Sequence, residues 1–144
     1  MGVIASLLFA AASVAAPSPH SAATLTSVVD RGTFATELAD FPRFVRENRR
    51  TYRELDWSTD YCSAPFVGNT GRSFNFRLPC QRHDFAYRNL KILGAFNEDN
   101  RKRVDDRFLE DMKSTCSPRG ITQRYNCYLW ADTFYAAVRT FASS

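Results

Sequence analysis

The 144-residue chain has no apolar stretch long enough to cross a bilayer, because its most apolar run, residues 3–12, is about half the required length. Small residues follow this run, and Val14 and Ala16 stand where a signal-peptidase site is expected, although no Lys or Arg precedes the run. We therefore expect residues 1–16 to be a signal peptide. The mature protein is expected to be secreted and extracellular, without a transmembrane segment.

The chain contains only four cysteines, and this even number leaves no unpaired thiol if all of them form disulfides. An oxidising extracellular compartment favours disulfides, and four cysteines allow three pairings. Pairing Cys62 with Cys80 and Cys116 with Cys127 closes the shortest loops, and we expect this pairing. Each bridge would stabilise the fold by about 2–4 kcal/mol. A zinc site at Cys80 and His83 is disfavoured, because no C-x-x-C pair accompanies them.

Motifs of several other protein classes are missing. No serine lies in a G-x-S-x-G setting, which argues against a serine hydrolase, and without an N-x-S/T sequence N-glycosylation is not expected. The formal net charge is +4, and basic residues cluster at residues 49–50 and 101–103. Such clusters favour an anionic surface or simply form a solvated face. No nucleic-acid-binding motif accompanies them, so we expect no nucleic-acid partner.

The sequence shows no internal repeat and no second domain, and its length suits one small domain with a modest core. Residues 17–33 are small and polar and are punctuated by proline, so we expect a loose mature N-terminus there. The folded domain is expected over residues 34–144, as a monomer.

Apolar spacing predicts helices in the first part of this domain. The apolar residues from Phe34 to Val45 recur at helical spacing, but Pro42 interrupts the run, so either one kinked helix or two short helices are expected. Residues 56–79 are rich in Ser, Thr, Asn, Gly and Pro. This composition predicts a long loop, with a short hairpin around residues 69–71.

Three further helices are expected toward the C-terminus. The first follows Pro79 and ends at Gly94, the second covers residues 97–114 with Asn97 as its N-cap, and the third covers residues 123–141. The first two would lie antiparallel at the centre of an all-α fold.

Residues 80–89, CQRHDFAYRN, hold the richest chemistry of the chain. On a helix, Cys80 faces His83 and Asp84, and Tyr87 lies one turn further on. His83 and Asp84 diverge by about 100° around the helix axis, so each can address a different partner in one cleft. The segment therefore predicts a site in which one residue handles a proton and the other binds a metal ion.

Two further motifs accompany this segment, DWSTDYC at residues 56–62 and RVDDRFLEDMK at residues 103–113. Over roughly residues 41–141, the three together resemble the secreted phospholipase A2 family of bacteria and fungi. The resemblance implies a small, mostly helical, disulfide-stapled fold with two disulfides and a calcium-binding loop. It also implies calcium-dependent hydrolysis of the sn-2 acyl ester of glycerophospholipids, to lysophospholipid and free fatty acid, at a membrane or micelle surface.

His83 is the candidate base for this hydrolysis. Deprotonating a water molecule at neutral pH suits a histidine, whose unperturbed pKa is about 6.5. The other histidine, His20, falls in the expected loose terminus. A lone histidine is more often a buried, hydrogen-bonded core residue. The neighbouring Asp84 and Tyr87 favour a functional role instead.

A catalytic imidazole needs a carboxylate to orient it, and Asp84 points away from His83 on the helix. Asp105 interrupts the apolar face of the next helix and is the best candidate, and the resemblance places the family's second dyad member there. Asp106 lies off that face and fits a solvated charge. Tyr87 either donates its hydroxyl to Asp105 or simply packs in the core, and the sequence favours neither alternative.

Calcium prefers hard oxygen ligands, and Asp84, which is not part of the dyad, can supply one or two. Asp60 is the natural second carboxylate, because the disulfide expected at Cys62 would bring its loop to the helix. The family pattern adds the main-chain carbonyl of Tyr61. Alternatively, Asp60 is a turn residue whose side chain bonds its own backbone. The same alternative applies to Asp56, which we place outside the site.

A protein of another class fits the same composition, namely a secreted disulfide-stapled binding protein, such as a toxin or elicitor, without turnover. Calcium-dependent release of fatty acid from lipid vesicles discriminates between the two. The headgroup preference and the biological target are not encoded in these motifs.

Overall fold

Helices make up most of the structure, a computed structural model that describes residues 19–62, 70–71 and 74–141. The elements in chain order are α1 (Ala22–Asp30), the π-helical segment η1 (Arg31–Ala35), the 3₁₀ turn η2 (Leu38–Asp40), α2 (Phe41–Asn48), β1 (Thr70–Gly71), β2 (Phe74–Asn75), α3 (Arg77–Ile92), α4 (Glu98–Cys116) and α5 (Ile121–Phe141). The all-α fold class is confirmed. Within the described ranges no helix is long and apolar enough to cross a membrane, and the expected signal at residues 1–16 lies outside them.

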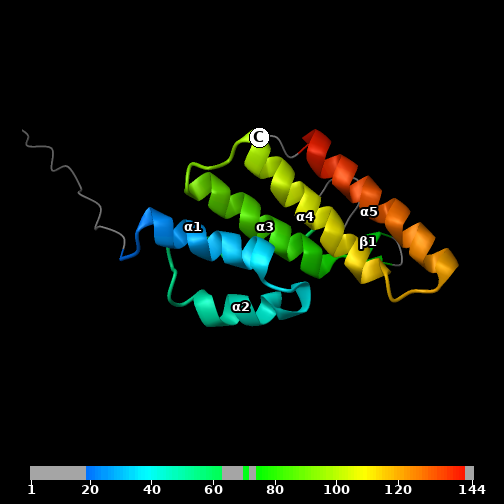
Figure 1. The fold of residues 1–144 in the computed structure, drawn as a ribbon, viewed down its shortest axis with the longest axis horizontal. Helices are drawn as coiled ribbons and strands as arrows, with labels where there is room; N and C mark the ends of the chain where they lie inside the picture. Colours follow the sequence, from blue (N-terminus) through cyan, green and yellow to red (C-terminus); the bar gives the residue numbers. More distant parts are fainter. Residues whose placement is uncertain (1–18, 63–69, 72–73, 142–144) are drawn as a thin grey trace, which may run out of the picture.

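The three longest helices form the body of the molecule, with α4 between α3 and α5 (Figure 1). Gly94 follows the C-cap of α3, and its φ of 65° lies in the left-handed region that glycine adopts without strain. Asn97 then caps α4, because its side chain accepts a hydrogen bond from the Asn100 amide at 2.9 Å. This short link turns the chain back on itself, so that α3 and α4 are antiparallel neighbours, as expected.

Apolar clusters hold α3 from two sides. One cluster joins α4, α5 and β2 and includes Phe108 and Phe134, while another joins α1 and α2 to α3 and includes Phe44 and Phe85. In the second cluster η1 approaches closely: a Cβ atom on Gly32 would lie 2.5 Å from a ring carbon of Phe44. Only glycine fits there without a shift of the rings. Packing on both sides fixes the middle of α3, where the CQRHDFAYRN segment lies.

Composition predicted a loose terminus over residues 17–33, but in the described part of this segment residues 22–30 form α1 and the chain continues into η1. The hydroxyl of Ser21 accepts a hydrogen bond from a backbone N–H of the first turn and caps α1. Leu25, Val28 and Val29 form a short apolar stripe on this helix and are buried in the cluster around Phe44. The expectation failed because burial against α2 and α3, rather than intrinsic propensity, supplies most of a short helix's stability.

The chain from residue 34 to residue 48 forms short separate elements, which agrees with two short helices rather than one kinked helix. The chain is extended at Thr36, between η1 and η2. Pro42 stands in the first turn of α2, where a missing N–H costs no hydrogen bond, so it begins this helix instead of kinking it.

A small hairpin is present in the long loop, but its position differs slightly from the expected one. Thr70 pairs with Asn75 and Gly71 pairs with Phe74, so Gly71 belongs to a strand, and Asn69 lies outside the described residues. α3 begins at Arg77, three residues earlier than expected, which puts Pro79 inside its first turn.

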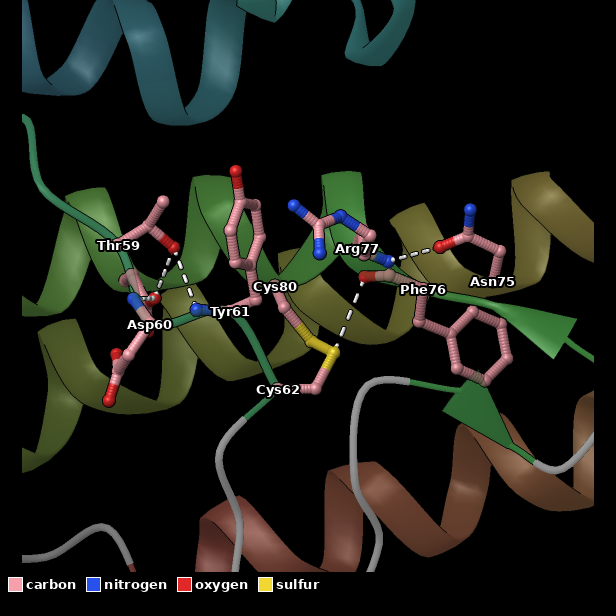
Figure 2. The surroundings of a disulfide bond; sticks show 9 residues. Thr59, Asp60, Tyr61, Cys62, Asn75, Phe76, Arg77 and Cys80 are labelled. Carbon is pink, nitrogen blue, oxygen red and sulfur yellow. Dashed lines mark hydrogen bonds between the residues drawn. A yellow bond between two sulfur atoms is a disulfide. The ribbon is translucent and has the colours of Figure 1, made fainter.

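The two disulfides have the expected pairing, in which each bridge closes the shortest possible loop. Cys62 is bonded to Cys80 and joins the loop before β1 to the start of α3 (Figure 2), while Cys116 is bonded to Cys127 and joins α4 to α5. The first bridge matters for the site, because it fixes the chain that follows residue 58 against α3.

Candidate active site

The side chains of α3 and α4 meet in a buried histidine–carboxylate pair. His83 Nε2 lies 2.8 Å from Asp105 Oδ1, and both side chains are buried. The rings of Tyr87 and Phe108 flank the imidazole, with centroids 4.2 Å and 4.6 Å from it. Tyr87 comes from one turn further along α3 and Phe108 from α4, so the antiparallel packing of these two helices builds the pair.

Asp105 is fully buried and accepts three hydrogen bonds. Its Oδ1 accepts from His83 and, at 2.6 Å, from the Tyr87 hydroxyl, and its Oδ2 accepts from an Arg139 N–H at 2.9 Å. Burial alone would raise the pKa of this carboxyl, but the bonds from His83, Arg139 and Tyr87 hold its pKa below the usual range. Asp105 is therefore an ionised acceptor, and His83 carries its proton on Nε2.

The sequence left open whether Tyr87 packs in the core or donates to Asp105, and it does both. Its ring packs against His83, and its hydroxyl donates a hydrogen bond to Asp105. Burial, and then the bond to the carboxylate, raise the pKa of this phenol above its usual range, so it stays a donor. Asp106, by contrast, pairs with Lys102 at 2.7 Å and accepts from Tyr135 at 2.8 Å, away from the imidazole. The two adjacent aspartates thus have different surroundings.

Arg139 is a residue of this cluster that the sequence analysis missed. It lies in the last turn of α5 and also donates to Glu98, at the start of α4. No local motif marks this arginine. A general signal exists, because a buried carboxylate beside a histidine needs compensating donors.

The loop before Cys62 lies against α3 next to this pair. The Thr59 hydroxyl donates to Asp84 Oδ2 at 2.5 Å, and the Asp60 amide donates to the same oxygen at 3.2 Å. The Tyr61 amide donates back to Thr59 Oγ1 at 2.9 Å (Figure 2). Tyr61 has a φ of 59°, in the left-handed region, so the chain turns sharply here. Thr59 was also missed by the sequence analysis.

The Asp60 carboxylate is held by Arg88, whose guanidinium donates to Oδ1 at 2.7 Å. Burial, together with the negative charge of Asp60, raises the pKa of the Asp84 carboxyl, although the Thr59 hydroxyl opposes this. Asp56 is the turn residue that the sequence suggested: its Oδ1 accepts from the Ser58 amide at 2.8 Å.

The donor chemistry of this loop fits calcium. Asp84 is a partly buried carboxylate whose charge is opposed by a second carboxylate, a situation that a bound cation relieves. Among the residues that the structure describes, no three His, Cys, Asp or Glu side chains form a group that could hold a metal. The expected set contains two carboxylates and the Tyr61 carbonyl, and calcium commonly completes its coordination with carbonyl oxygens and water.

A buried imidazole with an ionised carboxylate on one nitrogen can act as a general base through its other nitrogen. The model of the prokaryotic phospholipase A2 family matches residues 29–142 of the chain. The secretory phospholipase A2 of Arthroderma benhamiae is 36% identical over 138 residues, which cover 92% of this chain and 90% of that protein. The secretory phospholipase A2 of Beauveria bassiana is 35% identical over 114 residues, which cover 79% of this chain and 57% of that protein. The chain belongs to the prokaryotic phospholipase A2 family and is a phospholipase A2.

Proposed function

We propose that this enzyme is a secreted, calcium-dependent phospholipase A2 that hydrolyses the sn-2 acyl ester of glycerophospholipids to lysophospholipid and free fatty acid. The observation that carries the proposal is the 2.8 Å contact between His83 Nε2 and Asp105 Oδ1 at a carboxylate with 0% exposure. His83 and Asp105 are the proposed catalytic pair, supported by Tyr87.

His83 acts as the base through Nδ1, because Nε2 already donates to Asp105. The Nδ1 lone pair takes a proton from a water molecule as the water oxygen attacks the ester carbonyl carbon, and the imidazolium then gives this proton to the leaving alcohol. Asp105 stays ionised and stabilises the imidazolium, while Tyr87 and Arg139 hold the carboxylate in place. No covalent acyl-enzyme is needed.

Asp84, Asp60 and the main-chain carbonyl of Tyr61 would hold the calcium ion. When bound, the ion supplies a positive charge that binds the lipid phosphate and stabilises negative charge on the ester carbonyl oxygen. Thr59 orients Asp84 by donating to one of its oxygens, and the disulfide at Cys62 keeps the loop on α3.

Two features support secretion. The apolar leader predicts export, and the two disulfides suit an oxidising compartment. The substrate is a phospholipid in a membrane or micelle, and the enzyme acts on it as a monomer.

The test is fatty-acid release from vesicles of phosphatidylcholine labelled in the sn-2 chain. Wild type should release label with calcium and not with EDTA, and His83→Gln should lose at least about 10²-fold in rate because it lacks the base. The variant should still fold and bind calcium. His20→Gln is the matched control, since this histidine bonds Glu54 at 2.9 Å instead.

Turnover by His83→Gln within tenfold of wild type would contradict the assignment of the base. Vesicle binding by wild type without release of label would instead fit the toxin or elicitor. Release of label from vesicles labelled in the sn-1 chain, and not from those labelled in the sn-2 chain, would contradict the proposed position of cleavage.

A further inference from the structure

Arg88 contacts the loop that carries the proposed calcium ligands. It follows Asp84 by one turn on α3 and extends over the loop. Its guanidinium donates to Asp60 Oδ1 at 2.7 Å and to Ser58 Oγ at 2.8 Å, and it lies 3.7 Å from Asp56 Oδ2. A carboxylate assigned to calcium is therefore held by a cation of the protein itself.

Among the residues that the structure describes, the charges around Arg88 are not balanced. The carboxylates of Asp56, Asp60 and Asp84 all interact with this guanidinium. One positive charge against three negative charges leaves an excess of two negative charges, which is the charge that one divalent cation neutralises. The guanidinium thus offsets one of these charges, and it does so at Asp60, a carboxylate that calcium would also bind.

The loop does not depend on Arg88 for its position. The Asn89 side chain accepts from the Asp56 amide at 2.7 Å and donates to the Asp56 carbonyl at 2.8 Å. Thr59 bonds Asp84, and Cys62 is bonded to α3 through its disulfide. Since these contacts fix the backbone before and after Asp60, Arg88 acts on the Asp60 carboxylate and not on the position of the loop.

We propose that Arg88 competes with calcium for the Asp60 carboxylate and so sets the calcium concentration at which the enzyme becomes active. The inference rests on the calcium site proposed above. For calcium to bind, the guanidinium has to release Asp60 Oδ1, and its charge continues to repel the ion afterwards. The result is a weak site, in keeping with extracellular calcium modules, whose Kd is about 10⁻⁴–10⁻³ M.

Calorimetric titration of the full mature chain with calcium chloride, without lipid and at low ionic strength, tests this competition. Arg88→Gln removes the charge and should bind calcium about three- to tenfold more tightly than wild type, and this gain should shrink as salt is added. Arg88→Lys keeps the charge but lacks the planar guanidinium that bonds Asp60 and Ser58 together, so its gain in calcium affinity should be smaller. Arg46→Gln is the matched control, because Arg46 is exposed on α2 and its loss changes the net charge equally.

Weaker calcium binding by both Arg88 variants would mean that Arg88 stabilises the site, and unchanged binding would mean that it has no effect on calcium. Either result would overturn the competition. An equal gain in the Arg46 variant would also overturn it, because net charge alone would then explain the effect. If wild type binds no calcium, the calcium site itself fails, and the competition fails with it. Thermal unfolding in EDTA checks that each variant is folded.

Discussion

Asp84 on α3 and Asp105 on α4 show how two aspartates acquire different chemistry from their surroundings. Asp105 is fully buried, and three donors keep it ionised. Asp84 is partly buried and faces another carboxylate, and both effects raise its pKa. The first is suited to steady an imidazolium, and the second is suited to receive a cation.

Replacement of each aspartate by asparagine should separate the two roles. Asp84→Asn removes a charged ligand, so calcium affinity should fall by more than about tenfold and activity should fall with it. Asp105→Asn leaves the proposed ligands in place but disturbs the imidazole tautomer, so the rate should fall by about 10²–10⁴-fold while calcium still binds. Calcium titration and fatty-acid release measure the two effects.

Asp106→Asn is the control for this comparison, because it changes the adjacent aspartate, which bonds Lys102 and Tyr135. It should change both readouts little. If the Asp105 variant lost calcium and the Asp84 variant kept it, the two roles would have to be exchanged.

At the scale of elements, the proposed site depends on three helices at once. α3 supplies His83 and Tyr87, α4 supplies Asp105, and α5 supplies Arg139. The apolar cluster on the other side of α3 includes α1, so the N-terminal helix takes part in holding α3 in place. This contribution can be measured separately from catalysis.

Leu25→Ala should lower the free energy of unfolding by about 2–4 kcal/mol, because Leu25 is buried in the cluster of α1, α2 and α3. Thr26→Ala is the control, since Thr26 is exposed on the same helix and its replacement should cost less than about 0.5 kcal/mol. Urea unfolding with the disulfides intact measures both values. Equal stability of the two variants would mean that α1 is the loose terminus that composition suggested.

At the scale of the whole molecule, buried carboxylates link stability to pH. The pKa of Asp105 is lowered on folding, so the stabilisation it provides is complete above the unfolded pKa of about 3.9 and is lost as the pH falls through the folded value. Asp111, paired with Arg82 in the interior, has a pKa that burial raises, and it acts in the opposite direction.

The difference in unfolding free energy between wild type and Asp105→Asn should therefore shrink between about pH 5 and pH 2. Urea unfolding in EDTA at a series of pH values measures it, with Asp106→Asn as the surface comparison. A difference that grew on acidification would mean that the Asp105 carboxyl is raised, not lowered, in pKa.

Much of the fold followed from local patterns. Gly94 and Asn97 marked the link between α3 and α4, and the shortest-loop rule found both disulfides, because caps and short loops involve residues close in sequence. The spacing of His83, Asp84 and Tyr87 on one helix also followed from the sequence. Asp105 interrupts the apolar stripe of its helix, and this interruption identified it as the candidate partner of His83.

Only the tertiary structure decided the contacts that join distant parts of the chain. Arg139 reaches Asp105 across 34 residues, and Arg88 reaches Asp60 across 28. The burial of α1 belongs to the same group, because its short apolar stripe acquires meaning only when α2 and α3 cover it. A helical pattern specifies which face is apolar, whereas the partner of that face, and of each buried charge, depends on how the helices pack.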